Sequence, residues 1–194
     1  MPPPYHEITA LPVVVPLAVV AFAVLLRRLR RRGALTVPRV VVAVVVCAYG
    51  AGVVANTLFP IALGKAGSGV SWWEYPNLTP LVNTEPFDML SNVVVFVPLG
   101  VLLPLVARAR STGRVLLWAF LISLTMELVQ WLNAVVAHGG HVADVNDLLA
   151  NTLGAPIGYG LLRAALLVPP LRRLVAAATW PTARSDEPEL QPAR

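Results

Sequence analysis

The sequence predicts an all-α fold, a bundle of about five membrane-spanning helices. Hydrophobic residues make up 57% of the 194 residues and charged residues only 13%, whereas soluble domains are roughly 25% charged. The apolar residues come in blocks of about 20, the length that a helix needs to cross the hydrocarbon core of a membrane. The arginines lie between these blocks, so the net charge of +5 indicates membrane orientation and not a nucleic-acid partner.

Five blocks are expected to cross the membrane as helices, each close to the required length. The first contains Pro12 and Pro16, which cannot donate helical hydrogen bonds. The five run from Ile8 to Leu26, from Val40 to Leu63, from Asp88 to Ala107, from Val115 to Val136 and from Asp144 to Val168.

The blocks divide the chain into three parts. Residues 1–39 hold the first helix and a basic loop, and residues 40–168 form the main membrane domain. Residues 169–194 are expected to form a disordered cytoplasmic tail, which is Pro-rich and charged from Pro181 onward. Cys47 is the one cysteine, so neither an internal disulfide nor a Cys-based zinc site is possible.

The positions of the basic residues predict the topology. Arginines fill the connection between the first and second blocks and that between the third and fourth, and they lie at the end of the fifth block or after it. On the opposite side, Lys65 is the single Lys or Arg. The positive-inside rule therefore predicts a multi-pass cell-membrane protein with its N-terminus outside and its C-terminus in the cytoplasm.

Five polar side chains from three predicted helices fall at similar depth in the outer half of the membrane. At 1.5 Å per residue, Glu127 and Asn151 lie about 10 Å below the outer surface, and the others are shallower. Polar groups at this depth avoid lipid, so they are expected to face one another or a water-filled cleft. The five are Asn92, Glu127, Gln130, Asp147 and Asn151.

Helical spacing supports one shared site. The last predicted helix carries Asp144, Asp147, Asn151, Gly154 and Gly158 in steps of three and four, which form one stripe. The two glycines make a GxxxG pair, which permits close contact with another helix.

Glu127 has two interpretations. A membrane-buried ionisable residue costs about 2.5–3.5 kcal/mol on insertion scales. It could act as interhelical glue, or it could belong to a site for a polar headgroup or for proton transfer. Glue seldom needs three carboxylates, so the whole cluster favours a functional site. We predict ligand contacts from Asn92, Glu127, Gln130, His141, Asp144, Asp147 and Asn151.

A metal site is not expected in the outer loop. His138, His141, Asp144 and Asp147 recur every three residues, and imidazole and carboxylate together can bind a divalent ion. Gly139 and Gly140 break any helix there, so we assign neither a metal nor a cofactor. The sequence has no GxSxG, P-loop or HExxH motif, so it identifies no catalytic class.

Several of these residues belong to motifs that resemble the VanZ-like family. Residues 92–100 followed by Pro104 are similar to its NxxxFxPLG signature, and residues 77–80 to its NLxP element. Residues 127–130 match ExxQ, and residues 141–154 match RxxDxxDxxxNTxG, with His141 where the family usually has Arg. The match covers roughly residues 40–162 in the family's motif order. It implies a bacterial membrane protein of a family whose name-giving member is associated with reduced teicoplanin susceptibility.

Three functions remain open at this stage. We favour a non-catalytic envelope protein that binds membrane lipids or lipid-linked precursors at the outer leaflet. The alternative is an enzyme that modifies an envelope lipid, with Glu127 and Asp147 as acid and base. A small-solute transporter is less favoured, because no charged residue marks the inner half of the membrane. The sequence does not fix the oligomeric state.

Overall fold

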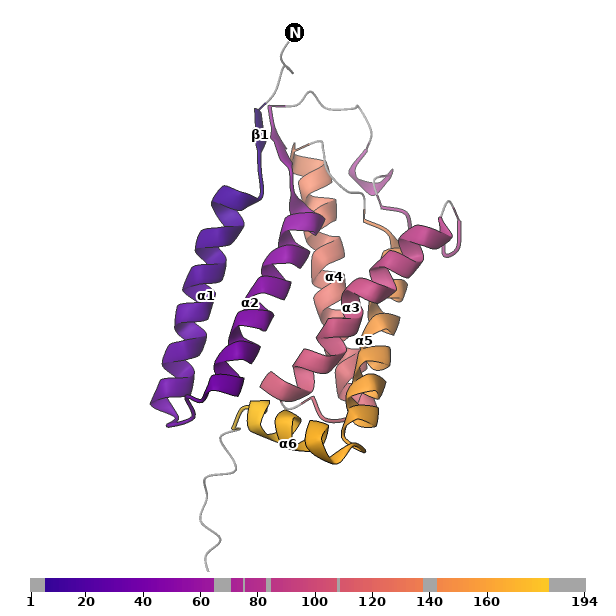
Figure 1. The fold of residues 1–194 in the computed structure, drawn as a ribbon. Coiled ribbons are helices and arrows are strands. Elements are labelled where there is room, and N and C mark those ends of the chain that lie inside the picture. The colour runs from indigo at the N-terminus through magenta and orange to yellow at the C-terminus, as the bar shows by residue number, and fades with distance from the viewer. Residues whose placement is uncertain are drawn as a thin grey trace, which may run out of the picture.

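The computed structural model describes residues 6–64, 71–74, 76–82, 85–107, 109–137 and 143–181. Five long helices stand side by side, and a short sixth helix crosses one end of the bundle (Figure 1). The predicted helix bundle is confirmed. The helices are α1 (Leu11–Arg31), α2 (Val37–Leu58), α3 (Pro86–Val106), α4 (Thr112–Ala137), α5 (Val145–Ala165) and α6 (Pro169–Ala178).

Four of these helices, α1 to α4, are long and apolar enough to cross a membrane. Helix α5 is also 21 residues long, but it carries more polar residues and packs against both α3 and α4. The expected number of five spans is therefore approximate: four are clear from composition, and α5 matches them in length and place.

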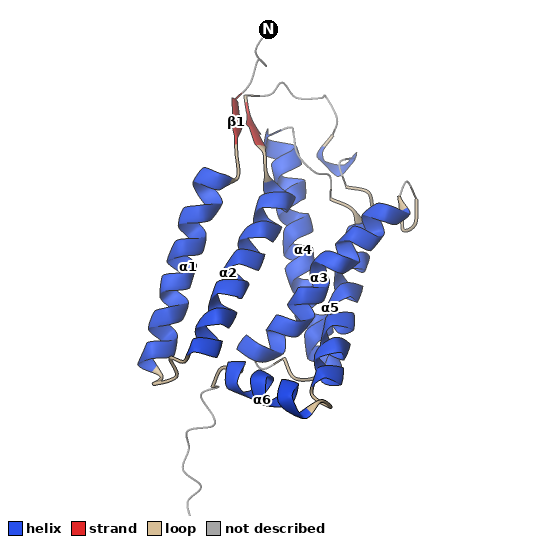
Figure 2. Ribbon diagram, viewed as in Figure 1, coloured by secondary structure: helices blue, strands red, loops and turns tan. Residues whose placement is uncertain are grey.

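Two short strands add to the helical fold. They are β1 (His6–Ile8) and β2 (Ile61–Leu63), which pair antiparallel at the end of the bundle away from α6 (Figure 2). They correct two predicted boundaries, because Ile8 and Leu63 were expected to be helical. Pro60 explains the second, since the residue before a proline is disfavoured in the helical region. Phe59 is accordingly extended, with φ −113° and ψ 153°.

Helix α6 corrects the prediction of a disordered tail from residue 169. Pro169 and Pro170 look like helix breakers in the sequence, but they occupy the first turn of α6, where proline is tolerated. The bundle holds the helix in place: Trp180 N–H donates to Leu105 O at 2.8 Å, and Arg39 Nε donates to Thr179 O at 3.0 Å. Residues 182–194 lie outside the described residues.

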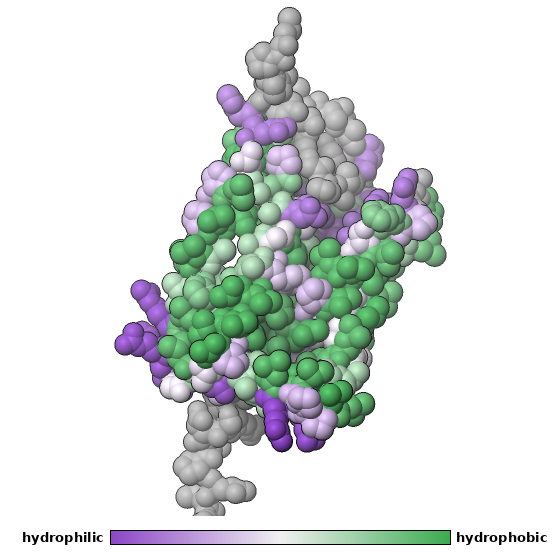
Figure 3. All heavy atoms as spheres, viewed as in Figure 1, coloured by the Kyte–Doolittle hydropathy of each residue, from purple (hydrophilic) through white to green (hydrophobic). Residues whose placement is uncertain are grey.

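The hydrophobic surface faces outward, as a lipid environment requires. Only 6% of the apolar window of α1 and of α2 is buried, against 33% in α3 and 28% in α4. Hydrophobic residues cover most of the middle of the visible face, and strongly hydrophilic ones gather toward its ends (Figure 3). Most of the protein interior therefore lies on the α3, α4 and α5 side of the bundle.

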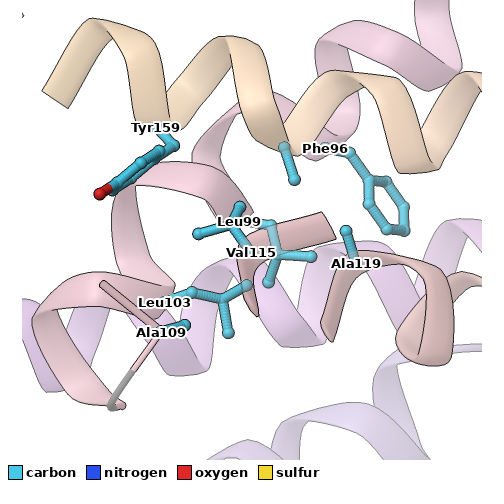
Figure 4. Close-up of a cluster of buried hydrophobic side chains, with 8 residues drawn as sticks. Phe96, Leu99, Leu103, Ala109, Val115, Ala119 and Tyr159 are labelled. Carbon is cyan, nitrogen blue, oxygen red and sulfur yellow. The ribbon is translucent and has the colours of Figure 1, made fainter. Parts of the chain in front are cut away.

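That interior is a small apolar core between α3, α4 and α5, in which side chains from the three helices meet (Figure 4). Phe96 and Val115 are almost fully buried. The core also fixes the connection between α3 and α4, because the Tyr159 hydroxyl donates to Arg110 O at 2.8 Å. Its members are Phe96, Leu99, Leu103, Ala109, Val115, Ala119, Ala155 and Tyr159.

Three glycines bring α3 and α5 into backbone contact. A Cβ added at Gly154 would lie 2.1 Å from Val93 O, and one at Gly158 would lie 1.9 Å from Val97 O. From the other side, a Cβ on Gly100 would lie 1.8 Å from Ala155 O. The predicted role of the GxxxG pair in close helix contact is confirmed, and Gly100 is the matching glycine on α3.

Candidate functional site

A polar cavity of about 480 Å³ lies between α2, α3, α4 and α5. All five polar residues predicted to share a depth line it, so the three predicted helices do converge. Helix α2 supplies a fourth wall that the sequence argument did not include. The polar lining residues are Tyr49, Asn56, Thr57, Asn92, Glu127, Gln130, Asp147 and Asn151.

Glu127 lies on α4 with only 7% of its surface exposed. Its Oε2 accepts the Asp144 N–H at 2.8 Å, which ties α4 to the start of α5. A buried carboxylate needs such a donor because its desolvation is otherwise uncompensated. The glue and site interpretations are thus compatible: one oxygen of Glu127 holds the fold, and the side chain still lines the cavity.

Asn92 and Asp147 form the second polar contact of the cavity. The Asn92 Nδ2 donates to Asp147 Oδ1 at 2.5 Å, which joins α3 to the first turn of α5. Asp147 lies near the positive end of the α5 dipole, a position that stabilises a carboxylate. The pair therefore presents polar oxygens at a defined place in the cavity wall.

Gln130 and Asn151 each have a buried oxygen without a hydrogen-bond partner in the described structure. Gln130 Nε2 donates to the backbone carbonyl of Thr57 at 3.3 Å. Because that carbonyl can only accept, the NH₂ group of Gln130 must face it, and this fixes the position of Gln130 Oε1. Asn151 Nδ2 donates to Ser123 Oγ at 3.1 Å. A buried polar atom without a hydrogen-bond partner lowers stability by roughly 1–3 kcal/mol. A ligand that donates a hydrogen bond to either oxygen would remove this cost.

The exposed part of the cavity lining belongs to α2 and α3, which indicates an opening between these two helices. Its lining residues on these two helices include the exposed Gly52, Asn56 and Pro98. The residues that α4 and α5 contribute at the far wall include the buried Glu127 and Asn151. Tyr49 connects α2 to α3, because its hydroxyl donates to Val95 O at 2.9 Å. An amphipathic molecule could enter this opening without leaving the membrane.

Asp144 is the residue that caps the start of α5. Its carboxylate caps α5, accepting Asn146 N–H at 2.7 Å, and its other oxygen accepts Asn77 Nδ2 at 3.0 Å. It is absent from the lining of the polar cavity. Asp144 therefore positions Glu127 through its backbone and anchors the preceding loop through its side chain.

The loop of residues 76–82 is fastened to the start of α5. Asn77 pairs with Asp144 in an isolated parallel bridge, and its backbone bonds to Ala143 O at 2.9 Å and to Val145 N at 3.0 Å. The fully buried Asn146 accepts the Leu81 N–H at 2.7 Å. Leu81 has φ 60°, an uncommon value for a residue other than glycine, and Asn146 helps to hold it there.

Sequence reasoning missed Asn56, Thr57 and Ser123, which are small polar residues inside apolar spans. Ser123 precedes Glu127 by one helical turn, so the spacing could have revealed it. His141, the remaining predicted ligand residue, lies outside the described residues. Within the part of the chain that the structure describes, no three His, Cys, Asp or Glu side chains gather as metal ligands would.

Comparisons with known proteins assign the family. The VanZ/LLP1 family model matches residues 46–168, which include the four walls of the polar cavity. The chain belongs to the VanZ/LLP1 family. It is also 36% identical over 91 residues to "Protein VanZ" of Enterococcus faecium. That match covers 44% of the chain and 52% of the relative, so the chain spans about half of the relative's length. No solved structure matches.

Proposed function

We propose that this VanZ/LLP1 protein binds the polar headgroup of an envelope lipid in the cavity between α2, α3, α4 and α5. The observation that carries the proposal is the chemistry of the lining. The unpartnered atoms there are acceptors, Gln130 Oε1 and Asn151 Oδ1, and the carboxylates of Glu127 and Asp147 line the same space. No Lys or Arg is among its lining residues.

This lining favours a ligand that donates hydrogen bonds. Sugar hydroxyls and ammonium groups do so, whereas a bare phosphate only accepts. The lateral opening between α2 and α3 supports a lipid, since its acyl chains could stay in the membrane while the headgroup enters. Lipid-linked envelope precursors carry sugars and fit the same chemistry.

A binding experiment tests the headgroup preference. The purified protein is melted in detergent with diglucosyl-diacylglycerol, phosphatidylethanolamine or phosphatidylcholine of matched chains. Choline has no N–H, so we expect the first two lipids to raise the unfolding temperature more than the third. A lipid at 100 times its Kd stabilises by about 2.7 kcal/mol. Equal shifts with all three lipids would contradict the proposal.

Variants connect binding to the cavity. Glu127→Gln and Asp147→Asn keep side-chain volume but remove charge, and we expect both to reduce the shift caused by the donor lipids. Asp88→Asn is the matched control, because Asp88 is exposed at the start of α3 and does not line the cavity. In cells, the same variants at matched expression would report whether the protein alters glycopeptide susceptibility, as its relationship to Protein VanZ suggests.

An enzyme that modifies an envelope lipid is the second candidate. The observation in its favour is that two carboxylates, Glu127 and Asp147, line one cavity, and two carboxylates in different surroundings can divide acid and base roles. Lipidomics of a deletion strain separates the two functions. An accumulated precursor or a changed headgroup would favour catalysis, and altered antibiotic binding with unchanged lipids would favour binding alone.

A further inference from the structure

A second cavity lies at the opposite, arginine-rich end of the bundle. It has a volume of about 430 Å³ and is bounded by the ends of α3 and α5, by the α3–α4 connection and by α6. Three arginines from three different segments line it: Arg110, Arg163 and Arg172. Nothing in the polar cavity described above involves these residues.

The walls of this cavity are held in place by hydrogen bonds. Tyr159, which is 7% exposed, donates its hydroxyl to Arg110 O at 2.8 Å. The same hydroxyl accepts Arg163 Nη1 at 3.5 Å. The contact between Trp180 N–H and Leu105 O keeps α6 against the end of α3. The three arginines therefore belong to segments whose relative positions are fixed.

No acidic side chain of the described residues lies at this end. The described acidic residues belong instead to β1, η1, the start of α3, the second half of α4 and the start of α5; they are Glu7, Glu74, Glu85, Asp88, Glu127, Asp144 and Asp147. The charges of Arg110, Arg163 and Arg172 therefore lack a carboxylate partner within the described structure. All three arginines are exposed, so they are accessible to an anionic ligand, whose negative charge they would attract.

The surroundings of the cavity are apolar as well as basic. Leu105 and Leu162 are buried in its wall, while Leu171 and Leu174 are 43% and 59% exposed on α6. Helix α6 runs across the end of the bundle (Figure 1) and combines these leucines with Arg172 and Arg173. This arrangement is typical of a helix that lies in the membrane interface.

A smaller neighbouring cavity has the same donor character. It measures about 220 Å³ and is lined by Arg28, Arg32 and Trp180. The buried indole N–H of Trp180 has no partner in the described structure. This end of the bundle is thus rich in hydrogen-bond donors, whereas the unpartnered atoms of the polar cavity are acceptors.

We infer that the cavity lined by Arg110, Arg163 and Arg172 binds the phosphodiester headgroup of an anionic phospholipid. A guanidinium group binds phosphate through two parallel N–H···O hydrogen bonds. Basic pockets between membrane helices recognise anionic headgroups. The adjoining apolar wall and the interfacial α6 favour a lipid over free phosphate, because only the lipid would bury hydrocarbon there.

Titration of the full-length protein with dioctanoyl-phosphatidylglycerol tests this inference. Dioctanoyl-phosphatidylcholine and inorganic phosphate serve as the comparison ligands. We expect the anionic lipid to bind more tightly than either, and the double variant Arg163→Gln/Arg172→Gln to weaken its binding by about tenfold or more. Replacing both arginines with Lys keeps the positive charge but not the two parallel hydrogen bonds that each guanidinium can form, so we expect an intermediate loss of lipid affinity.

The control is Arg27→Gln/Arg31→Gln, which removes the same charge at the same end from exposed residues that line neither cavity. This pair should weaken binding less than about twofold. Unfolding temperatures in phosphatidylcholine verify that all variants are folded. Equal losses in the two Gln pairs would overturn a defined site, and phosphate binding as tight as lipid binding would overturn the lipid assignment.

Discussion

Asn146 illustrates how one side chain can organise the end of the molecule opposite α6. Its side chain accepts from the Leu81 N–H and donates from Nδ2 to Asp144 Oδ1 at 2.8 Å. Through these bonds, the loop of residues 76–82, the cap of α5 and the residue that bonds Glu127 form one unit. The polar cavity thus depends on residues that do not line it.

We predict that Asn146→Ala lowers the free energy of unfolding by about 1–3 kcal/mol, because a loop N–H loses its acceptor and a buried space is left. Thermal unfolding in detergent measures the change. Ser91→Ala is the control, since Ser91 bonds only within its own helix, to Phe87 O at 2.8 Å. Equal stability of the two variants would show that the loop is not held by Asn146.

The candidate site could be predicted from the sequence only in part. Depth and spacing identified Asn92, Glu127 and Asn151, because ionisable and amide groups deep in a membrane have few acceptable surroundings. Asn56 and Thr57 were not predicted, since a single polar residue in an apolar span can face a cavity, a neighbouring helix or the headgroup region. The capping role of Asp144 also could not be foreseen, because its spacing equally fits the ligand stripe.

At the scale of elements, α3 and α5 can make backbone contact because glycines, which have no side chain, stand at the positions where the two helices meet. We predict that Gly158→Ala destabilises the protein by about 1–3 kcal/mol or more, because its Cβ would overlap Val97 O and push the helices apart. Thermal unfolding again provides the measurement, and the cavity should lose its ligand shift in parallel.

Gly160→Ala, on the same helix, is the matched control. A Cβ there has no heavy atom within 4 Å, so helix propensity alone should stabilise the protein by about 0.5–1 kcal/mol. If both glycine variants lost stability equally, helical flexibility and not close packing would explain the glycines.

The elements themselves were largely predictable, and the errors have physical causes. Long apolar blocks identify membrane helices because lipid leaves the backbone no alternative partner. At the ends of helices this constraint relaxes. Pro60 ends α2 early, and Pro169 begins α6 inside the segment of residues 169–194 that was expected to be a disordered tail. Both prolines lie at a helix boundary, but the sequence alone does not say which side of each is helical, and Pro98 and Pro156 lie inside helices.

At the scale of the whole molecule, the arginine distribution predicts that the α6 end faces the cytoplasm. Single cysteines introduced into a Cys47→Ala background test this orientation with an impermeant thiol reagent on intact cells. We expect Ser71→Cys, at the outer end, to be labelled and Ser111→Cys, between α3 and α4, to be protected. Labelling of Ser111→Cys before lysis would contradict the topology.

Close glycine packing between α3 and α5 also affects how such proteins can diverge. The fold places strict demands on a few positions that permit backbone contact or hold the loop, whereas most of α1 and α2 needs only to stay apolar. In a saturation-mutagenesis library, we expect Gly100, Gly154 and Gly158 to accept almost no replacement, and Val41 and Val44 to accept most hydrophobic ones. Distant relatives are then expected to share these few glycine positions, while the apolar residues of α1 and α2 differ between them.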